Sequence, residues 1–115
     1  MKIINRAAFL ELPSGTIYCK GERWAFENLC VKGDSMDDDW HYLCPCGIEF
    51  HDSGQLFDRY EEMLARGASY PMEDGWCRDG VFDHDEIFLI FEKADLEVLR
   101  SLIDRSITAA SKAAS

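Results

Sequence analysis

The feature that most constrains the fold is an apolar stripe with helical spacing in the middle of the chain. Its members recur at the spacing i, i+1, i+4, i+7 and i+8, and they are Leu56, Phe57, Tyr60, Met63 and Leu64. This is the pattern of one face of an α-helix. Asp52 or Ser53 can cap the helix, Gln55 fits a capping box with Asp52, and Gly67 is typical of a helix end. We therefore predict an amphipathic helix here.

Three short segments rich in β-branched and aromatic residues precede this helix, at residues 16–19, 29–32 and 40–44. Such segments favour strands, and their tight connections predict an antiparallel meander. The last connection is an Asp37-Asp38-Asp39 turn. Residues 87–91 form a continuous apolar run, which is typical of a strand buried on both faces or nearly so.

Two further helices are expected near the ends of the chain. Asn5 can cap a short helix from Arg6 to about Leu12, and Ala94-Asp95 opens a long C-terminal helix. Residues 107–115 fade into alanine and serine and are expected to fray. The sequence therefore predicts one α+β domain over residues 1–115. It consists of an antiparallel sheet of about four strands, with the short N-terminal helix, the middle amphipathic helix and the long C-terminal helix on one face.

The same periodicities predict the core. Most of the tryptophan and tyrosine side chains are expected inside, with one or two at the surface. The predicted core residues are Phe9, Leu10, Ile17, Leu29, Val31, Phe57, Tyr60, Leu64, Phe88, Ile90, Leu96, Leu99 and Ile103.

The charge of the chain lies almost entirely in residues 34–86. This region holds fifteen of the 22 acidic residues and three of the 12 basic ones, a net charge of −12 within a total of −10. Such a surface repels nucleic acid and anionic membranes and attracts basic surfaces. We therefore expect a protein partner with a basic surface and no direct binding of nucleic acid. The candidate partner residues, all expected to face solvent, are Asp37, Asp38, Asp39, Glu61, Glu62, Glu73, Asp74, Asp79, Asp83 and Asp85.

The weak candidates for metal ligands are His41, Cys44, Cys46 and His51, which together could make a zinc site. The spacing argues against zinc, because knuckles place two residues between their cysteines and only Pro45 stands between these two. In a strand over 40–44, His41 and Cys44 would also point to opposite faces. A redox pair is an alternative, although oxidoreductase motifs use Cys-x-x-Cys. We predict no metal, no cofactor and reduced thiols.

The acidic run Asp83-His84-Asp85-Glu86 suggests a divalent-ion site or a general base. An EF-hand loop starting at Asp83 would require glycine where Phe88 stands. Cys77 with His84 could act as nucleophile and base, but nothing supplies the orienting groups that such a pair needs. A solvated acidic loop is the favoured interpretation, and we expect no enzymatic activity.

The compartment follows from two expectations. The start of the chain lacks the apolar run of a signal peptide, and no stretch approaches the roughly 18 apolar residues of a membrane span. Five cysteines, an odd number, favour reduced thiols. We therefore expect a soluble protein without membrane contact.

Three blocks of the sequence, at residues 5–16, 78–83 and 91–95, resemble small accessory proteins encoded by bacteriophages and prophages. The blocks cover about a fifth of the chain. The resemblance implies a mobile-element origin and an accessory role. Together with the lack of an export signal and the reduced thiols, it leads us to expect the cytoplasm of a bacterial host. It carries over no active site, because the group has none assigned.

Three hypotheses for function follow. The first is a non-enzymatic acidic binding protein, in its sharpest form an anti-CRISPR-like inhibitor of a host defence or nucleic-acid-handling complex, with carboxylates that imitate phosphates. The second is a small metal-binding or cysteine-based enzyme. The third is a structural accessory that oligomerises, as a possible homodimer, through the C-terminal helix. Acidity that only keeps the protein soluble is the alternative for any single carboxylate.

Overall fold

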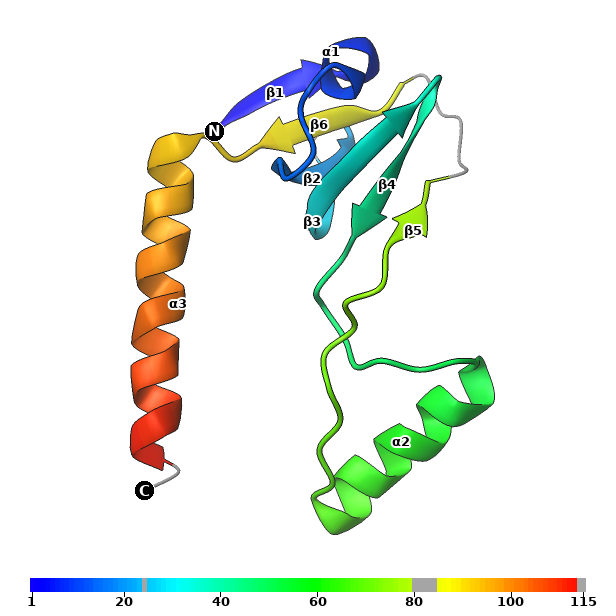
Figure 1. The fold of residues 1–115 in the computed structure, drawn as a ribbon, viewed down its shortest axis with the longest axis vertical. Coiled ribbons are helices and arrows are strands. Elements are labelled where there is room, and N and C mark those ends of the chain that lie inside the picture. Colours follow the sequence, from blue (N-terminus) through cyan, green and yellow to red (C-terminus); the bar gives the residue numbers. More distant parts are fainter. Residues whose placement is uncertain (24, 80–84, 114–115) are drawn as a thin grey trace.

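The computed structural model describes residues 1–23, 25–79 and 85–113 of the chain. These residues form a six-stranded antiparallel sheet and three helices (Figure 1), which confirms the α+β class. The strands are β1 (Lys2–Asn5), β2 (Ile17–Glu22), β3 (Ala25–Met36), β4 (Asp39–Leu43), β5 (Cys77–Arg78) and β6 (Ile87–Ile90). The helices are α1 (Arg6–Leu10), α2 (Ser53–Arg66) and α3 (Lys93–Ala113).

The strand order in the sheet is β1-β6-β2-β3-β4-β5. Strands β2, β3 and β4 form the predicted meander, and β6 is the predicted apolar strand. It lies between β1 and β2 rather than at an edge. The expectation of about four strands is wrong, because β1 and β5 complete the two edges. Both are short, and they are strands through their pairing with β6 and β4, which no local sequence pattern indicates.

The core is an aromatic cluster between α1 and one face of the sheet. Phe9 of α1 stacks on Phe88 with ring centroids 4.0 Å apart, and Trp40 meets Phe9 edge-on at 5.0 Å. Trp40 Nε1 donates a hydrogen bond of 2.8 Å to the Tyr18 hydroxyl, so the polar atoms of both rings are satisfied. Helix α1 begins as predicted at Asn5, whose side chain accepts a hydrogen bond from the Ala8 N–H.

The predicted core is only partly correct. Phe9, Phe88 and Ile90 are buried, as predicted. The half-buried members of the predicted set are Leu10, Ile17, Leu29, Val31, Leu96 and Leu99. The prediction is wrong for four residues of α2 and α3 that are largely exposed, namely Phe57 (64%), Tyr60 (47%), Leu64 (91%) and Ile103 (51%).

These four side chains are exposed because α2 and α3 do not lie on the sheet. Figure 1 shows α3 projecting away from the end of β6, and α2 standing at the end of two long arms. Neither helix buries a residue, so the expectation that they cover one face of the sheet is wrong. The radius of gyration is accordingly 16.8 Å, whereas a compact domain of this length has about 13 Å.

The ends of α2 agree with the sequence. The Asp52 side chain accepts a hydrogen bond from the Gln55 N–H (2.8 Å), and Gly67 adopts the left-handed conformation at the C-cap. The Gln55 side chain accepts from the N–H of His51, one residue before the position that a standard capping box uses. Helix α3 continues to Ala113, and the fraying expected over 107–115 stays a prediction.

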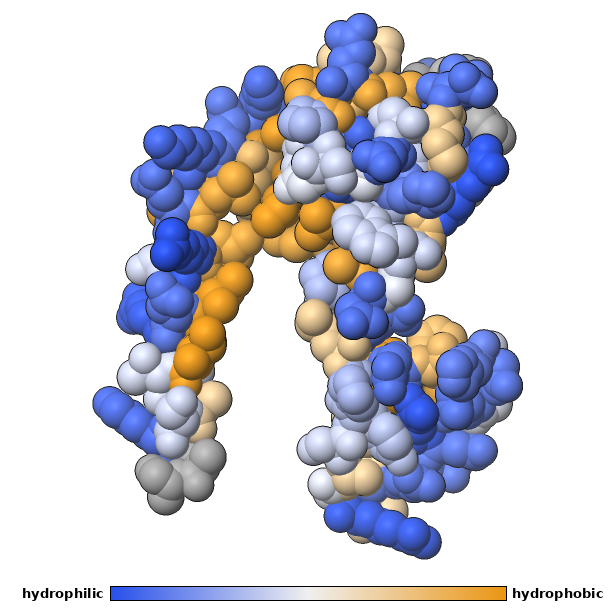
Figure 2. All heavy atoms as spheres, viewed as in Figure 1, coloured by the Kyte–Doolittle hydropathy of each residue, from blue (hydrophilic) through white to orange (hydrophobic). Residues whose placement is uncertain are grey.

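The sheet face opposite α1 is apolar. Register places Ile3, Leu89, Cys19 and Leu29 in one row across four strands, because directly opposed residues share a face. A second row contains Ile17, Val31 and Leu43. Figure 2 shows hydrophobic side chains on the side of α3 that faces the opening between α3 and the arms of α2, and on the adjoining part of the sheet. Within the described residues, neither α2 nor α3 makes more than a minor contact with a strand of this sheet.

Candidate functional site

The most distinctive surface belongs to α2 and the two arms that connect it to the sheet, residues 44–52 and 67–76. The arms pair with one another, since Ile48 forms an antiparallel bridge with Met72. Beside this bridge the Glu49 N–H donates a hydrogen bond of 2.9 Å to the Pro71 carbonyl. The pairing closes the base of α2, which holds the helix away from the sheet.

Side chains then attach α2 to its own arms. Arg59 donates a hydrogen bond of 2.6 Å to the Glu49 carbonyl, and its guanidinium lies 4.5 Å from the centre of the Tyr70 ring. The Tyr70 hydroxyl donates to the Glu62 carboxylate, and this hydrogen bond raises the pKa of Tyr70 above its ordinary value. The helix is therefore braced by contacts within residues 47–73.

The outer surface of α2 combines exposed apolar and acidic side chains. Phe57, Tyr60 and Leu64 lie at i, i+3 and i+7, so they share one side of the helix. Glu61 lies four residues after Phe57 and three before Leu64, so it stands between them on the helix surface. Asp58 lies one turn before Glu61, and both carboxylates are exposed. Sequence reasoning placed these apolar side chains in the core. The signal it missed is the density of carboxylates on the same helix, which disfavours packing against a sheet.

The structure divides the candidate partner residues into three groups. Those exposed as expected are Asp37, Asp38, Glu61, Glu62, Asp74 and Asp85. Glu73 is half-buried, and Asp83 lies outside the described residues. For Asp39 and Asp79 the expectation of exposure is wrong, because both are buried. The acidic region is therefore exposed only in part.

Asp39 is buried beside a cation. Its carboxylate pairs with the Arg78 Nε and accepts a hydrogen bond of 2.9 Å from the Trp40 N–H. Burial alone would raise the pKa of Asp39, but these two hydrogen bonds hold it below its ordinary value. Asp39 thus joins β4 to β5, which is a structural role.

Asp79 belongs to a second buried ionic network. Lys20 Nζ lies 3.2 Å from the Asp79 carboxylate and 3.5 Å from that of Glu86, and Glu86 also pairs with Arg6 at 2.8 Å. Arg6 in turn places its guanidinium over the Trp40 ring, 4.9 Å from its centre. Four charged side chains from four parts of the sequence therefore meet at one edge of the core.

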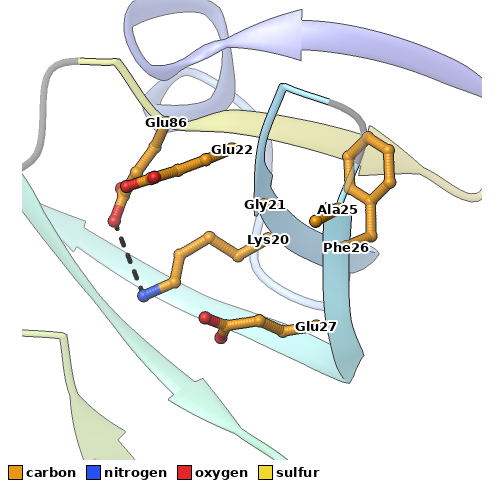
Figure 3. A pocket seen from close by; sticks show the side chains of 7 residues that line it. All are labelled: Lys20, Gly21, Glu22, Ala25, Phe26, Glu27 and Glu86. Carbon is orange, nitrogen blue, oxygen red and sulfur yellow. Dashed lines mark ion pairs between the residues drawn. The ribbon is translucent and has the colours of Figure 1, made fainter.

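The network borders an open pocket of about 500 Å³. Figure 3 shows Lys20 reaching toward Glu86 across this pocket, with Glu27 on the other side of the ammonium. Burial opposes the charge on Lys20, but Asp79 and Glu86 outweigh it and raise the pKa of Lys20 above its ordinary value. Lys20 is therefore held protonated, whereas an amine nucleophile must be neutral. Among the described residues that line the pocket there is no serine, cysteine or histidine.

The four weak metal candidates do not come together. His41 lines a separate pocket beside Gly33 and Trp76, and His51 is exposed in the first arm. Cys44 and Cys46 are neighbours, with 3.3 Å between their sulfur atoms. Across residues 1–23, 25–79 and 85–113, no three histidine, cysteine or carboxylate side chains are grouped so as to hold an ion.

Two of the remaining catalytic candidates lie outside the described residues. Cys77 is an exposed free thiol on β5, while His84 and Asp83 lie outside the described residues. Glu86 is not part of a solvated loop, since it is buried in the ionic network described above.

Comparisons of the chain with protein-family models, curated proteins and solved structures find no match. Among the described helices, none has the length and apolar character needed to cross a bilayer. The chemistry of the chain's own surfaces is therefore the basis for proposing a function.

Proposed function

We propose that this protein is a non-enzymatic binding protein whose helix α2 docks on a basic surface of a partner protein. The observation that carries the proposal is the exposure of Phe57, Tyr60 and Leu64 on a helix that also presents carboxylates. An exposed apolar group with a polar rim is typical of an interaction site. Amphipathic helices of this kind bind with their apolar side in a groove of the partner.

The charges around the stripe define the chemistry of that partner. Asp58, Glu61 and Glu62 flank the apolar side chains on α2, and the surrounding region 34–86 carries a net charge of −12. A groove lined by arginine and lysine would complement this charge and accelerate the encounter. The same carboxylates would repel nucleic acid, so the partner is a protein.

The partner we propose is a host complex that handles nucleic acid or acts in host defence. The protein inhibits this complex in an anti-CRISPR-like manner. Basic grooves in such complexes normally hold phosphates, and exposed carboxylates on a braced helix can occupy them instead. The resemblance of residues 5–16, 78–83 and 91–95 to phage and prophage accessory proteins supports this class. The protonated, ion-paired state of Lys20 supports a function without nucleophilic catalysis by this residue.

The test is capture of proteins from a bacterial lysate on the immobilised chain, washed with increasing salt. A partner held by charge elutes as screening rises. The double substitution Phe57→Ser/Leu64→Ser on α2 should abolish capture. The matched control Val98→Ser/Ile107→Ser removes two apolar residues from α3 that are also mostly exposed (61% and 59%) and should retain capture. Capture of the same protein by the α2 double variant would contradict the proposal.

A second candidate function is self-assembly as a structural accessory, favoured by the apolar sheet face and the apolar side of α3. The occupant we propose for these surfaces is a second copy of the chain. Helix α3 carries four basic and three acidic residues, so it lacks the negative charge that would attract a basic partner. Sedimentation should show a dimer, and Ile103→Asp/Ile107→Asp should give a monomer. A monomeric parent protein at high concentration would contradict this candidate.

A further inference from the structure

Cys44 and Cys46 lie where the chain leaves β4 and enters the first arm of α2. The Cys46 N–H donates a hydrogen bond of 2.9 Å to the Cys44 carbonyl, which closes a three-residue γ-turn around Pro45. Proline fixes its own φ near −65°, close to the value that an inverse γ-turn requires. The turn is therefore restrained by covalent geometry, and it holds the two sulfur atoms 3.3 Å apart.

The surroundings give the two thiols different accessibility. Cys46 is exposed and accepts a hydrogen bond of 3.7 Å from the Asn28 amide. Cys44 is half-buried, and its thiol donates to the Leu29 carbonyl at 3.5 Å. An outer thiol that solvent reaches is thus backed by an inner thiol in van der Waals contact with it. This is the arrangement that two-step thiol–disulfide exchange requires.

We propose that Cys44 and Cys46 form a reversible dithiol–disulfide site that reacts with low-molecular-weight disulfides. In the first step the Cys46 thiolate attacks one sulfur of the disulfide RSSR, whose S–S bond breaks and releases one RS⁻. In the second step the Cys44 thiolate attacks the Cys46 sulfur and releases the second RS⁻. The two protons that leave the cysteines are taken up by the two RS⁻ groups. The protein loses two electrons, and RSSR is reduced to two RSH.

The local chemistry sets the speed and the reversibility of this reaction. The hydrogen bond between the two thiols and burial raise the pKa of Cys46, and burial raises the pKa of Cys44. The reaction should therefore accelerate as pH rises, because the thiolate is the attacking species. A disulfide that closes so short a loop departs from the preferred geometry, which makes it easy to reduce.

Other thiols provide both a competitor and a control. Register places Cys30 of β3 directly opposite Cys44, because Val31 pairs with Leu43, so Cys30 is the competing partner for Cys44. Cys77 is exposed on β5 and serves as the control for exposure alone. The site is independent of the docking of α2, so the inference stands even where that proposal fails.

The test is incubation of the reduced full-length protein with oxidised glutathione at pH 7 and pH 8.5, followed by thiol counting and mass spectrometry of peptides. The parent should lose two thiols and two hydrogen atoms within the peptide that contains Cys44 and Cys46, faster at the higher pH. Cys44→Ser should accumulate glutathione on Cys46, since the second step is blocked. In Cys46→Ser the rate of thiol loss should fall at least tenfold. In Cys77→Ser this rate should stay close to that of the parent.

Three results would overturn the proposal. The first is retention of both thiols in the parent, and the second is formation of a Cys30–Cys44 disulfide instead. The third is an unchanged rate of thiol loss in Cys46→Ser. A measurement on the parent alone avoids dependence on the folding of any variant. Brief alkylation with iodoacetamide should label Cys46 before Cys44, and prior oxidation should protect both. Alkylation of both thiols after oxidation would again contradict the site.

Discussion

Arg6 and Glu86 lie 80 positions apart in the chain and form a buried ion pair, with 2.8 Å between Nη1 and Oε2. Both side chains are less than a tenth exposed. The pair joins the start of α1 to the segment that enters β6, and so it fixes the helix that carries Phe9 over the core. Removal of one partner leaves the other charge buried without full compensation.

Arg6→Met should therefore destabilise the protein by about 3–5 kcal/mol, because among the described residues it leaves only Lys20 as a cation that pairs with Glu86. The double variant Arg6→Met/Glu86→Leu should cost less than the sum of the two single variants, since it removes both buried charges. Urea unfolding of the four proteins measures this difference. Strict additivity would show that the two charges are not coupled.

Acid stability should depend on Asp39. Its pKa is lowered in the folded protein, so its ion pair with Arg78 stabilises the fold at pH values above the unfolded pKa of about 4. This contribution is lost as pH falls through the lower folded value. Asp39→Asn should lower stability at pH 7 and flatten the decline below pH 4. Asp38→Asn, at an exposed neighbour, is the control. A similar decline for both variants, measured by unfolding between pH 2 and 7, would contradict this account.

Two apolar truncations should show that the stability of the protein depends on the core and not on the outer side of α2. Phe9→Ala should cost about 3–5 kcal/mol, because it opens a cavity among Tyr18, Trp40 and Phe88. Leu64→Ala should change stability by no more than about 0.5 kcal/mol, since Leu64 is 91% exposed. Denaturant unfolding provides both values. A large loss for Leu64→Ala would mean that α2 is packed in solution.

A matched pair of glycines tests the β2–β3 hairpin. A Cβ atom at Gly21 would collide with the Ala25 carbonyl across the register shift between Cys19 and Gly21, whereas one at Gly47 would meet nothing. Gly21→Ala should destabilise by about 2–3 kcal/mol, and Gly47→Ala should be close to neutral. Equal effects on the unfolding midpoint would argue against the close approach of the two strands.

Gly21 and a third glycine, Gly33, show why strand ends could not be predicted. The sequence places strand ends at Lys20-Gly21 and at Gly33, because glycine disfavours strands. In the structure β2 continues through Gly21 to Glu22, and β3 continues through Gly33 to Met36. A Cβ atom at Gly33 would lie 3.0 Å from the His41 Cβ and 3.2 Å from the Trp76 ring, which is tighter than an ordinary van der Waals contact. Glycine suits both positions because the neighbouring strand, and at Gly33 also Trp76, approaches the backbone closely.

Periodicity predicts α2, and residue types predict its N-cap at Asp52 or Ser53 and its end at Gly67, because these features depend on neighbouring residues. It does not predict what covers an apolar stripe. The buried carboxylates were missed for a related reason, since Asp39 meets Arg78 only where β4 pairs with β5. Helix ends can therefore be derived from neighbouring residues in the sequence. Side chains that meet only because two strands pair cannot be derived in this way.

The association rate constant of a captured partner protein, at low and high salt, tests the central claim most directly. The proteins to compare are the parent, Asp58→Lys/Glu61→Lys on α2, and the control Glu11→Lys/Glu97→Lys, which changes the net charge equally at exposed sites elsewhere. Both variants should keep the melting temperature of the parent, because exposed charges contribute little to stability.

Our account predicts that the α2 variant associates about tenfold more slowly at low salt, that the control stays close to the parent, and that high salt removes most of the difference. Equal association rates for all three proteins, without salt dependence, would contradict the account and leave the carboxylates of α2 as a coat that keeps the protein soluble.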